Sequence, residues 1–363
     1  MLNAEVINAA SQFAYNGRPT SAEECKRGHI NSTYFVSCES ADGESYKYVL
    51  QAINTGVFKN PEHVMSNMVN VTKHIKRKLL ETGEESRQKV IELIPLKTGG
   101  FIYRNGEGRV WRSYEYIVGE NYQFAESPEL LEFVGKAFGE FQMQLSDFDA
   151  SKLYDTIPDF HNTPKRLADL ELAVKKDECD RADSVREEID FIFARRDKCS
   201  YIMDGIKCGS LPLRVTHNDT KLNNIMINGA DSCVIDLDTV MPGSVLADFG
   251  DVIRYGASTG AEDERDLDKV FLRLDMFESF TKGFIDGLCG SLTPYEIESF
   301  PMSAYIITLE LSMRFLEDYL KGDKYFRISY PDQNLARTRK HLKLALDMEA
   351  KMEDMKAIVK KYI

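Results

Sequence analysis

Short β-rich runs alternate with turn signals in the first third of the 363-residue chain. Asp42 and Gly43 form a hairpin-turn signal, because glycine adopts positive φ without steric cost. Asn60 and Pro61 are residue types that favour the cap and the first turn of a helix, which we expect to run to about Leu80. This part of the chain predicts an antiparallel sheet with one main helix. The strands predicted in it are 30–38, 46–53, 90–94, 100–104 and 109–117.

Beyond Gly119 the apolar positions follow a helical period. The first such helix has one apolar face, formed by Leu130, Val134, Phe138, Phe141 and Leu145. A charge-rich stretch over 163–207 predicts about two helices with a solvated face. Later segments predict three short strands and three helical regions: 213–217, 225–228 and 232–237, then 263–288, 294–321 and 334–360. The sequence therefore predicts an α+β protein with an N-terminal lobe over 1–118 and a mostly helical C-terminal lobe over 119–363.

Composition narrows the possible functions. The 46 basic and 58 acidic residues give a net charge of −12, which disfavours a nucleic-acid partner, because binding to phosphodiesters needs clustered Lys and Arg. No run of about 18 apolar residues and no signal-peptide pattern occurs, so we expect a cytoplasmic protein without a membrane partner. The seven cysteines are scattered without C-x-x-C spacing and predict free thiols. We expect a monomer or a homodimer.

One motif indicates the chemistry. The segment from His217 to Asn224 fits H-x-D-x-x-x-x-N, the catalytic-loop pattern of protein-kinase-like folds. In phosphoryl transfer a carboxylate orients the acceptor hydroxyl and accepts its proton, while an amide a few residues later reaches a metal ion bound to the nucleotide. The alternative is that Asp219 and Asn224 only stabilise a turn. Since strands are predicted on both sides of the motif, we favour Asp219 as the catalytic base and Asn224 as a metal ligand.

A second acidic position follows this loop. Asp236 ends an apolar run 17 residues after Asp219, and a carboxylate that leaves a buried strand suits a Mg²⁺ ligand. The tripeptide Asp248-Phe249-Gly250 also resembles a metal-binding motif of kinases, but it follows a loop rather than a strand. We interpret Asp248 and Asp251 as residues that cap or brace the next helix, and we predict that Asp236 is the metal ligand.

The predicted nucleotide loop is a weaker signal. Gly28, followed by His29 and Asn31, could let backbone N–H groups approach phosphates, although an ordinary hairpin turn explains one glycine equally well. The next strand has Gln51 where a Lys or Arg that pairs with phosphates is expected. Either Gln51 donates a neutral hydrogen bond, or a cation such as Lys47 replaces the missing one, or nucleotide binding is weak.

These residues resemble the aminoglycoside phosphotransferase and choline kinase superfamily, and more closely its N-acetylhexosamine 1-kinase branch. The resemblance spans nearly the whole chain and depends on these segments: 28–31, 48–54, 57–58, 217–224, 235–243, 248–251 with Arg254, and 314–316 with 318–320. It implies a protein-kinase-like two-lobed fold and transfer of the ATP γ-phosphate to the anomeric hydroxyl of N-acetylglucosamine or N-acetylgalactosamine. By the same resemblance Asp219 is the base, Asn224 and Asp236 hold Mg²⁺, and glutamine is usual at the position of Gln51.

The acceptor pocket is expected in the helical lobe. Glu310, Arg314 and Asp318 recur every four residues on one helical stripe. The stripe is either an ion-pair ladder that faces solvent, or a binding surface on which Arg314 hydrogen-bonds the sugar and Tyr325 supplies an aromatic or hydroxyl contact. We favour the binding surface.

Two other functions remain open at this point. One is a kinase for choline, ethanolamine, homoserine or an aminoglycoside, of which the last would need an acidic acceptor cleft. The other is a catalytically silent regulator that binds nucleotides, and the presence of Asp219, Asn224 and Asp236 together argues against it.

Overall fold

The computed structural model describes residues 4–25 and 30–363. By their internal contacts they form two compact units. The first unit comprises Met1–Asn121, Ser151–Pro158 and Ile225–Met241. The second comprises Tyr122–Ala150, Asp159–Asn224 and Pro242–Ile363. The chain therefore passes from one unit to the other between Asn224 and Ile225, at the end of the predicted catalytic loop.

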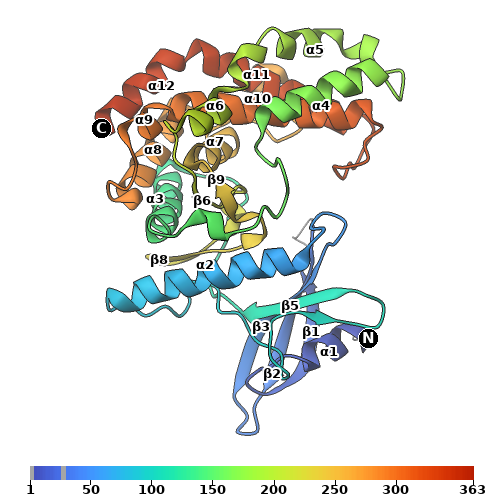
Figure 1. Cartoon of the computed structure of the whole chain (residues 1–363), viewed down its shortest axis with the longest axis vertical. Coiled ribbons are helices and arrows are strands. Elements are labelled where there is room, and N and C mark those ends of the chain that lie inside the picture. The colour runs from blue at the N-terminus through green and yellow to red at the C-terminus, as the bar shows by residue number, and fades with distance from the viewer. Residues whose placement is uncertain (1–3, 26–29) are drawn as a thin grey trace. The chain divides into compact units, whose positions relative to one another are not determined.

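A five-stranded antiparallel sheet forms the framework of the first unit (Figure 1). Its strands lie in the order β1-β2-β3-β5-β4. Their bounds are Arg18–Cys25 (β1), Ser32–Glu39 (β2), Ser45–Ile53 (β3), Tyr103–Arg104 (β4) and Val110–Glu115 (β5). In the register of β3 and β5, Gln51 lies opposite Arg112.

The two faces of this sheet are covered by different helices. Because side chains alternate along a strand, Tyr48, Leu50 and Ala52 of β3 share one face. They belong to a buried apolar cluster with residues of α1 (Ala4–Ser11). Gln51 is on the other face, as is Arg112, whose Nη1 lies 3.8 Å from the sulfur of Met68 in α2 (Pro61–Glu81). The Gln51–Arg112 pair is thus enclosed between the sheet and α2.

A hairpin and a short helical turn complete the first unit. β7 (Ile225–Asn228) and β8 (Asp231–Val234) pair in antiparallel fashion, and the 3-10 turn Leu237–Thr239 follows. The side-chain amide of Asn67 in α2 donates to the main-chain oxygens of Tyr154 (2.7 Å) and Val240 (2.9 Å). Asn67 therefore fixes the end of the segment that carries Asp236 and Asp238.

Most of the predicted elements of the first unit are confirmed. Strands occur within 30–38, 46–53 and 109–117, and the side chain of Asn60 caps α2 by accepting from the main-chain N–H of His63. The predicted strand at 90–94 is wrong, because only Leu93 forms an isolated bridge there. Val90, Ile91 and Ile94 are buried in an irregular segment. The pattern also does not predict β1, whose residues are mostly polar and exposed or half-buried.

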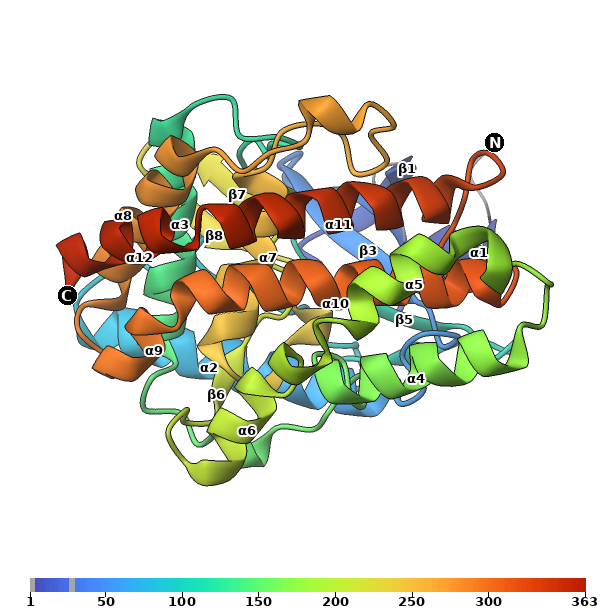
Figure 2. The same ribbon diagram turned by 90° about the horizontal axis from the view of Figure 1, so that it is seen from above.

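The second unit is mostly helical (Figures 1 and 2). Its first helices are α3 (Pro128–Gln144), α4 (Thr163–Lys176), α5 (Arg186–Phe193), α6 (Tyr201–Cys208) and α7 (Val245–Gly256). They are followed by α8 (Leu274–Leu288), α9 (Pro294–Glu298), α10 (Phe300–Leu320), α11 (Gln333–Ala350) and α12 (Met352–Val359). The short strand β6 (Arg214–Thr216) pairs with β9 (Met241–Gly243) and leads directly into the predicted catalytic loop.

Helix α10 lies against α4, α7 and α11, and α11 runs beside it in Figure 2. The ring of Phe249 in α7 stacks on Phe300 at the start of α10, with 4.0 Å between centroids. Phe249 also contacts Phe277, Phe280 and Phe284 of α8. This aromatic cluster is fully buried and anchors α7, the helix that carries Asp248 and Asp251.

Four helical predictions have incorrect bounds or counts. The stretch 163–207 contains three α-helices rather than about two, and the segment predicted from 263 becomes α-helical only at Leu274. The segments 294–321 and 334–360 are each divided into two helices. The spacing of apolar residues does not predict such breaks, because one residue between two helices changes that spacing very little. None of the helices in the described residues combines the length and the apolar character that a membrane crossing needs.

Candidate functional site

Asp219 is the centre of the predicted catalytic loop. One of its carboxylate oxygens lies 2.8 Å from Nζ of Lys221. Asn224, in the 3-10 turn Leu222–Asn224, donates from its amide to the main-chain oxygen of Asp219 (2.8 Å) and to the other carboxylate oxygen (3.2 Å). The structure therefore brings the predicted base and the predicted metal ligand of this loop into direct contact.

Asp219 is ionised at neutral pH. Burial alone would raise the pKa of Asp219, but the Lys221 ammonium, with smaller effects from His217 and Arg254, holds that pKa below its ordinary value. The side chain is still 23% exposed, so an acceptor can reach it. An ionised carboxylate that remains accessible can orient a hydroxyl group and accept its proton.

Two carboxylates of α7 hold the backbone of this loop. Asp248 is buried and accepts hydrogen bonds from the main-chain N–H groups of His217 (2.9 Å) and Asn218 (2.6 Å), and also from the Gln142 side chain. Asp251 accepts from the N–H of Thr220 at 3.0 Å. Both carboxylates are therefore used inside the second unit, where they hold the catalytic loop and do not cap α7, whose N-cap is Ser244.

The stripe on α10 is not an ion-pair ladder on the surface. Glu310 and Asp318 are only 1% and 5% exposed. Glu310 contacts His161 (2.8 Å) and Thr163 (2.6 Å), both of which come from the segment before and at the start of α4. The carboxylate of Asp318 accepts from three successive main-chain N–H groups, those of residues 324–326. The solvent-facing alternative is therefore wrong.

Arg314 differs from its two neighbours on the stripe. Its guanidinium lies over the rings of Phe160 (5.0 Å) and Phe326 (5.6 Å). Within residues 4–25 and 30–363 it has no hydrogen bond or ion pair with a protein group. Burial and the nearby Arg166 lower the pKa of Arg314. The turn that Asp318 orders carries Tyr325, which is 58% exposed.

In the first unit, Gln51 is part of a buried charge network. Its side-chain oxygen accepts from Nε (3.0 Å) and Nη2 (2.7 Å) of Arg112, and its amide nitrogen donates to Thr33. Arg112 also forms an ion pair with Asp238, which accepts a further hydrogen bond of 2.6 Å from Asn31. Burial would lower the pKa of Arg112, but Asp238 outweighs this effect and raises it.

The cation beside Gln51 is therefore Arg112, from the neighbouring strand. Lys47, the substitute considered from the sequence, is exposed and lies over the rings of Phe35 (5.0 Å) and Tyr116 (4.2 Å). The nucleotide-loop residues Gly28 and His29 lie outside the described residues.

The two acids after β8 have different surroundings. Asp238 is 2% exposed and is committed to Arg112 and Asn31. Asp236 is exposed and has a left-handed backbone with φ of 58°, a conformation that Asp tolerates better than most residues. An exposed carboxylate suits Mg²⁺, which prefers oxygen ligands. The amide oxygen of Asn224 suits it as well, since only the nitrogen of that amide is used to donate to Asp219. The donor atoms of Asp236 and Asn224 thus fit a hard divalent cation.

The described part of the chain contains no group of three or more His, Cys, Asp or Glu residues that could hold a metal by themselves. A cation held by one carboxylate and one amide would take its remaining ligands from water and from nucleotide phosphates, as Mg²⁺ commonly does. The described residues thus contain no dedicated metal cage.

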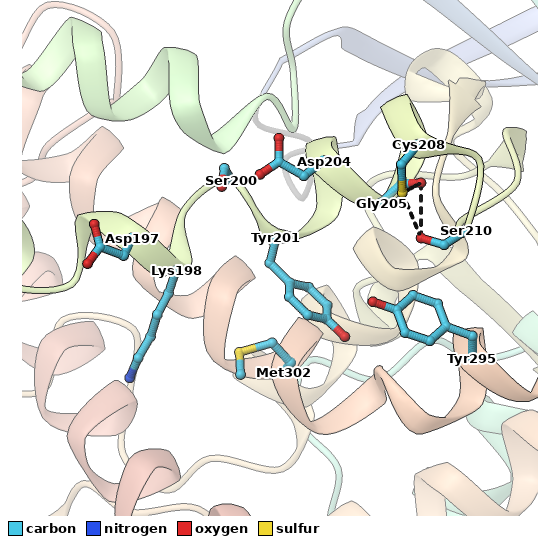
Figure 3. A pocket seen from close by; sticks show the side chains of 10 residues that line it. All are labelled: Asp197, Lys198, Ser200, Tyr201, Asp204, Gly205, Cys208, Ser210, Tyr295 and Met302. Atoms are coloured by element: carbon cyan, nitrogen blue, oxygen red, sulfur yellow. Dashed lines mark hydrogen bonds between the residues drawn. The ribbon is translucent and has the colours of Figure 1, made fainter.

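A surface pocket of about 450 Å³ lies elsewhere in the second unit (Figure 3). Tyr201 and Cys208 of α6 line it, with Tyr295 of α9 and Met302 of α10. None of the predicted site residues is among its lining residues.

Sequence reasoning missed Arg112, Lys221 and His161. Lys221 lies inside the recognised motif, where its distance of two residues from Asp219 was the available signal. The position of Arg112 beside Gln51 depends on the register of two strands 61 residues apart. His161 contacts residues 149 and 57 positions away, and no local pattern predicts those contacts.

Comparison with known proteins supports these observations. The model of the phosphotransferase enzyme family, abbreviated APH, matches residues 21–276. An aminoglycoside phosphotransferase from Alicyclobacillus acidocaldarius is similar in structure, with a TM-score of 0.61 and 13% identity, over 99% of this chain and 97% of that one. Amicoumacin kinase in complex with AMP-PNP, Ca²⁺ and Ami is also similar, with a TM-score of 0.60 and 14% identity, over 93% of this chain and 92% of that one. Choline kinase from Cryptosporidium parvum has a TM-score of 0.53 and 15% identity, over 92% of this chain and 90% of that one.

These structural similarities confirm the predicted α+β, protein-kinase-like fold. The family model covers well over half of the chain and includes the loop from His217 to Asn224 as well as Asp236. The chain therefore belongs to the phosphotransferase enzyme family.

Proposed function

We propose that this phosphotransferase is an ATP- and Mg²⁺-dependent kinase that phosphorylates the anomeric hydroxyl of an N-acetylhexosamine. The observation that carries the proposal is the braced catalytic loop, in which an ionised and accessible Asp219 contacts Lys221 and Asn224. Asp219 orients the sugar hydroxyl and accepts its proton as the oxygen attacks the γ-phosphorus. Lys221 keeps Asp219 ionised until that step.

The donor and the metal ion are assigned by their chemistry. The similar amicoumacin kinase structure contains AMP-PNP and Ca²⁺, which supports ATP and a divalent cation here. The amide oxygen of Asn224 and the carboxylate of Asp236 would hold Mg²⁺, and the bound ion would neutralise charge on the phosphates. Gly28, His29, Asn31 and Gln51 are the nucleotide-binding residues that we assign from the sequence.

The choice of Asp236 over Asp248 can be tested directly. Asp236→Ala should abolish Mg²⁺-dependent turnover, whereas Asp248→Ala should reduce turnover at every Mg²⁺ concentration, because Asp248 holds the loop backbone. Turnover is measured as a function of Mg²⁺ concentration for both variants. A raised Mg²⁺ requirement in Asp248→Ala together with an unchanged one in Asp236→Ala would reverse the assignment.

The acceptor side of the second unit favours a neutral substrate. Arg314 has no carboxylate partner in the described part of the chain, and Arg166 lowers its pKa by more than Glu310, which contacts His161, raises it. Such surroundings repel an amine-bearing acceptor such as choline, ethanolamine or an aminoglycoside. They suit hydroxyl and acetamido oxygens, which accept hydrogen bonds from a guanidinium. The resemblance to N-acetylhexosamine 1-kinases adds support, and we assign Arg314 and Tyr325 to sugar binding.

The test is a coupled ADP-release assay with a panel of acceptors. N-acetylglucosamine or N-acetylgalactosamine should support turnover, and ³¹P NMR should identify the product as the 1-phosphate. The methyl glycoside of the same sugar is the matched control, because it lacks only the anomeric hydroxyl, and it should be inert. Turnover with choline, homoserine or kanamycin but not with the amino sugars would reject the proposed acceptor. The assignment as a kinase would still hold.

A further inference from the structure

His161 joins the catalytic loop to helix α10. Its Nδ1 lies 2.8 Å from the carboxylate of Glu310, and its Nε2 lies 3.2 Å from the main-chain oxygen of Asn218. A main-chain oxygen can only accept a hydrogen bond. A neutral imidazole has a single N–H, so if the Glu310 carboxylate is ionised, both contacts are hydrogen bonds only when the ring carries two protons.

Glu310 is ionised. Burial alone would raise its pKa, but His161 and the hydroxyl of Thr163 hold that pKa below the ordinary value. The Thr163 hydroxyl donates to the second carboxylate oxygen, at 2.6 Å, and a donated hydrogen bond stabilises the ionised form of the carboxylate. Glu310 therefore presents a negative charge to the imidazole.

The other charged groups around the ring do not reverse this effect. Burial would lower the pKa of His161, but Glu310 on α10 outweighs it. Asp251 on α7 raises the pKa further, and Arg314, one turn after Glu310, opposes it only weakly. The net result is a raised pKa, which favours the imidazolium at neutral pH.

The bond to Asn218 acts on a backbone that needs support. Asn218 has a left-handed conformation with φ of 65°, which Asn adopts at lower cost than most residues with a side chain but which neighbouring contacts still help to hold. Asp248 holds its N–H and His161 holds its carbonyl oxygen. The carbonyl held by His161 belongs to the peptide that joins Asn218 to Asp219, so the orientation of that peptide affects the orientation of the base.

We propose that His161 is a positioning residue for phosphoryl transfer: its imidazolium form holds the Asn218 carbonyl and thereby keeps Asp219 aligned with the acceptor hydroxyl. The proposal rests on the assigned role of Asp219. It also links acceptor binding to alignment of the base, because the ring of Phe160, the preceding residue, lies under the Arg314 guanidinium.

The direction in which kcat changes with pH follows from the raised pKa of His161. A raised pKa means that the imidazolium contacts are present at lower pH and are lost as pH rises through the pKa of His161 in the folded protein. kcat of the wild type should therefore fall along an alkaline limb at a pH above 6.5, the ordinary His value. His161→Gln, which keeps one N–H donor and does not titrate, should lower kcat by roughly 10-fold at pH 7 and remove this limb.

Glu310→Gln is the second variant. It removes the anion that stabilises the imidazolium but keeps a hydrogen-bonding group of the same size, so the alkaline limb should move to lower pH. His74→Gln, on α2 of the first unit, is the matched control and should leave the limb unchanged. The limb can be recorded with whichever acceptor supports turnover, so a failure of the hexosamine assignment leaves this experiment intact.

Proton NMR of the wild-type protein provides a measurement that does not need turnover. The imidazole C2–H of His161, assigned by its absence from the His161→Gln spectrum or by selective labelling, should titrate with a midpoint above 6.5. A midpoint below that value would overturn the proposal, and so would an alkaline limb that neither His161→Gln nor Glu310→Gln changes.

Discussion

Two arginines, one in each unit, are used in opposite ways. In the first unit Arg112 donates to Gln51 and pairs with Asp238. In the second unit Arg314 lies over two aromatic rings and has no hydrogen bond or ion pair within the described part of the chain. Removal of one partner from a buried ion pair destabilises the fold, because it leaves an uncompensated buried charge, while a cation without an acceptor keeps its donors for a ligand. Substitution of the first should change stability, and substitution of the second should change kinetics.

The largest expected effect is on the paired arginine. Arg112→Met leaves the Asp238 carboxylate as an uncompensated buried charge and should lower the free energy of unfolding by about 3–5 kcal/mol. Urea unfolding followed by circular dichroism measures this change. Arg104→Met is the matched control, because Arg104 also pairs with a carboxylate, that of Glu62, but on the surface, and it should cost less than about 1 kcal/mol.

A second substitution tests whether the charge itself is responsible. Asp238→Asn in the Arg112→Met background removes the uncompensated charge and should recover part of the lost stability. If Arg112→Met were no more destabilising than Arg104→Met, the network around Gln51 would not be structural, and the comparison between the two arginines would fail.

Asp219→Asn should have the next largest effect, and on rate rather than on stability. kcat should fall by at least ~10², which is the lower end of what a base and its positioning supply. Nucleotide affinity and the melting temperature should change little, since Asp219 is partly exposed and its partner Lys221 is partly exposed as well. Asp231→Asn, at an exposed ion pair with Lys89 in the first unit, is a control that should leave kcat unchanged. Near-normal turnover of Asp219→Asn would remove this residue from the mechanism.

The sequence predicted some features and missed others for physical reasons. The start of α2 and the β7–β8 hairpin are local, because Asn60 with Pro61 and the Asn228-Gly229 turn determine them within a few residues. The Asp219–Asn224 contact is also local. The Arg112–Asp238 pair joins residues 126 positions apart, and its formation depends on strand register and on the packing of α2. A local sequence pattern specifies neither the strand register nor the packing of α2.

Arg314→Ala should have a smaller effect, confined to the acceptor. KM for the N-acetylhexosamine should rise by about 10-fold, as expected when one charged hydrogen-bond donor is lost, while KM for ATP changes little. Arg196→Ala is the matched control, because its guanidinium also lies over an aromatic ring, that of Phe193, at an exposed position. Unaltered sugar kinetics combined with a lower melting temperature would make Arg314 a structural residue like Arg112.

Tyr325 should show the smallest effect, because more than half of its side chain is exposed and water competes for its hydroxyl group. Tyr325→Phe should lower kcat/KM for the sugar by about 2- to 5-fold if the hydroxyl donates to the acceptor, and Tyr325→Ala should lower it further if the ring also packs against the sugar. Tyr295→Phe, at an exposed tyrosine of α9, is the control. Because Asp318 orders the turn through main-chain N–H groups, neither substitution at Tyr325 should disturb the turn itself. If both variants keep wild-type kcat/KM, acceptor recognition on this side of the second unit depends on Arg314 alone, and the contrast between the two arginines becomes sharper.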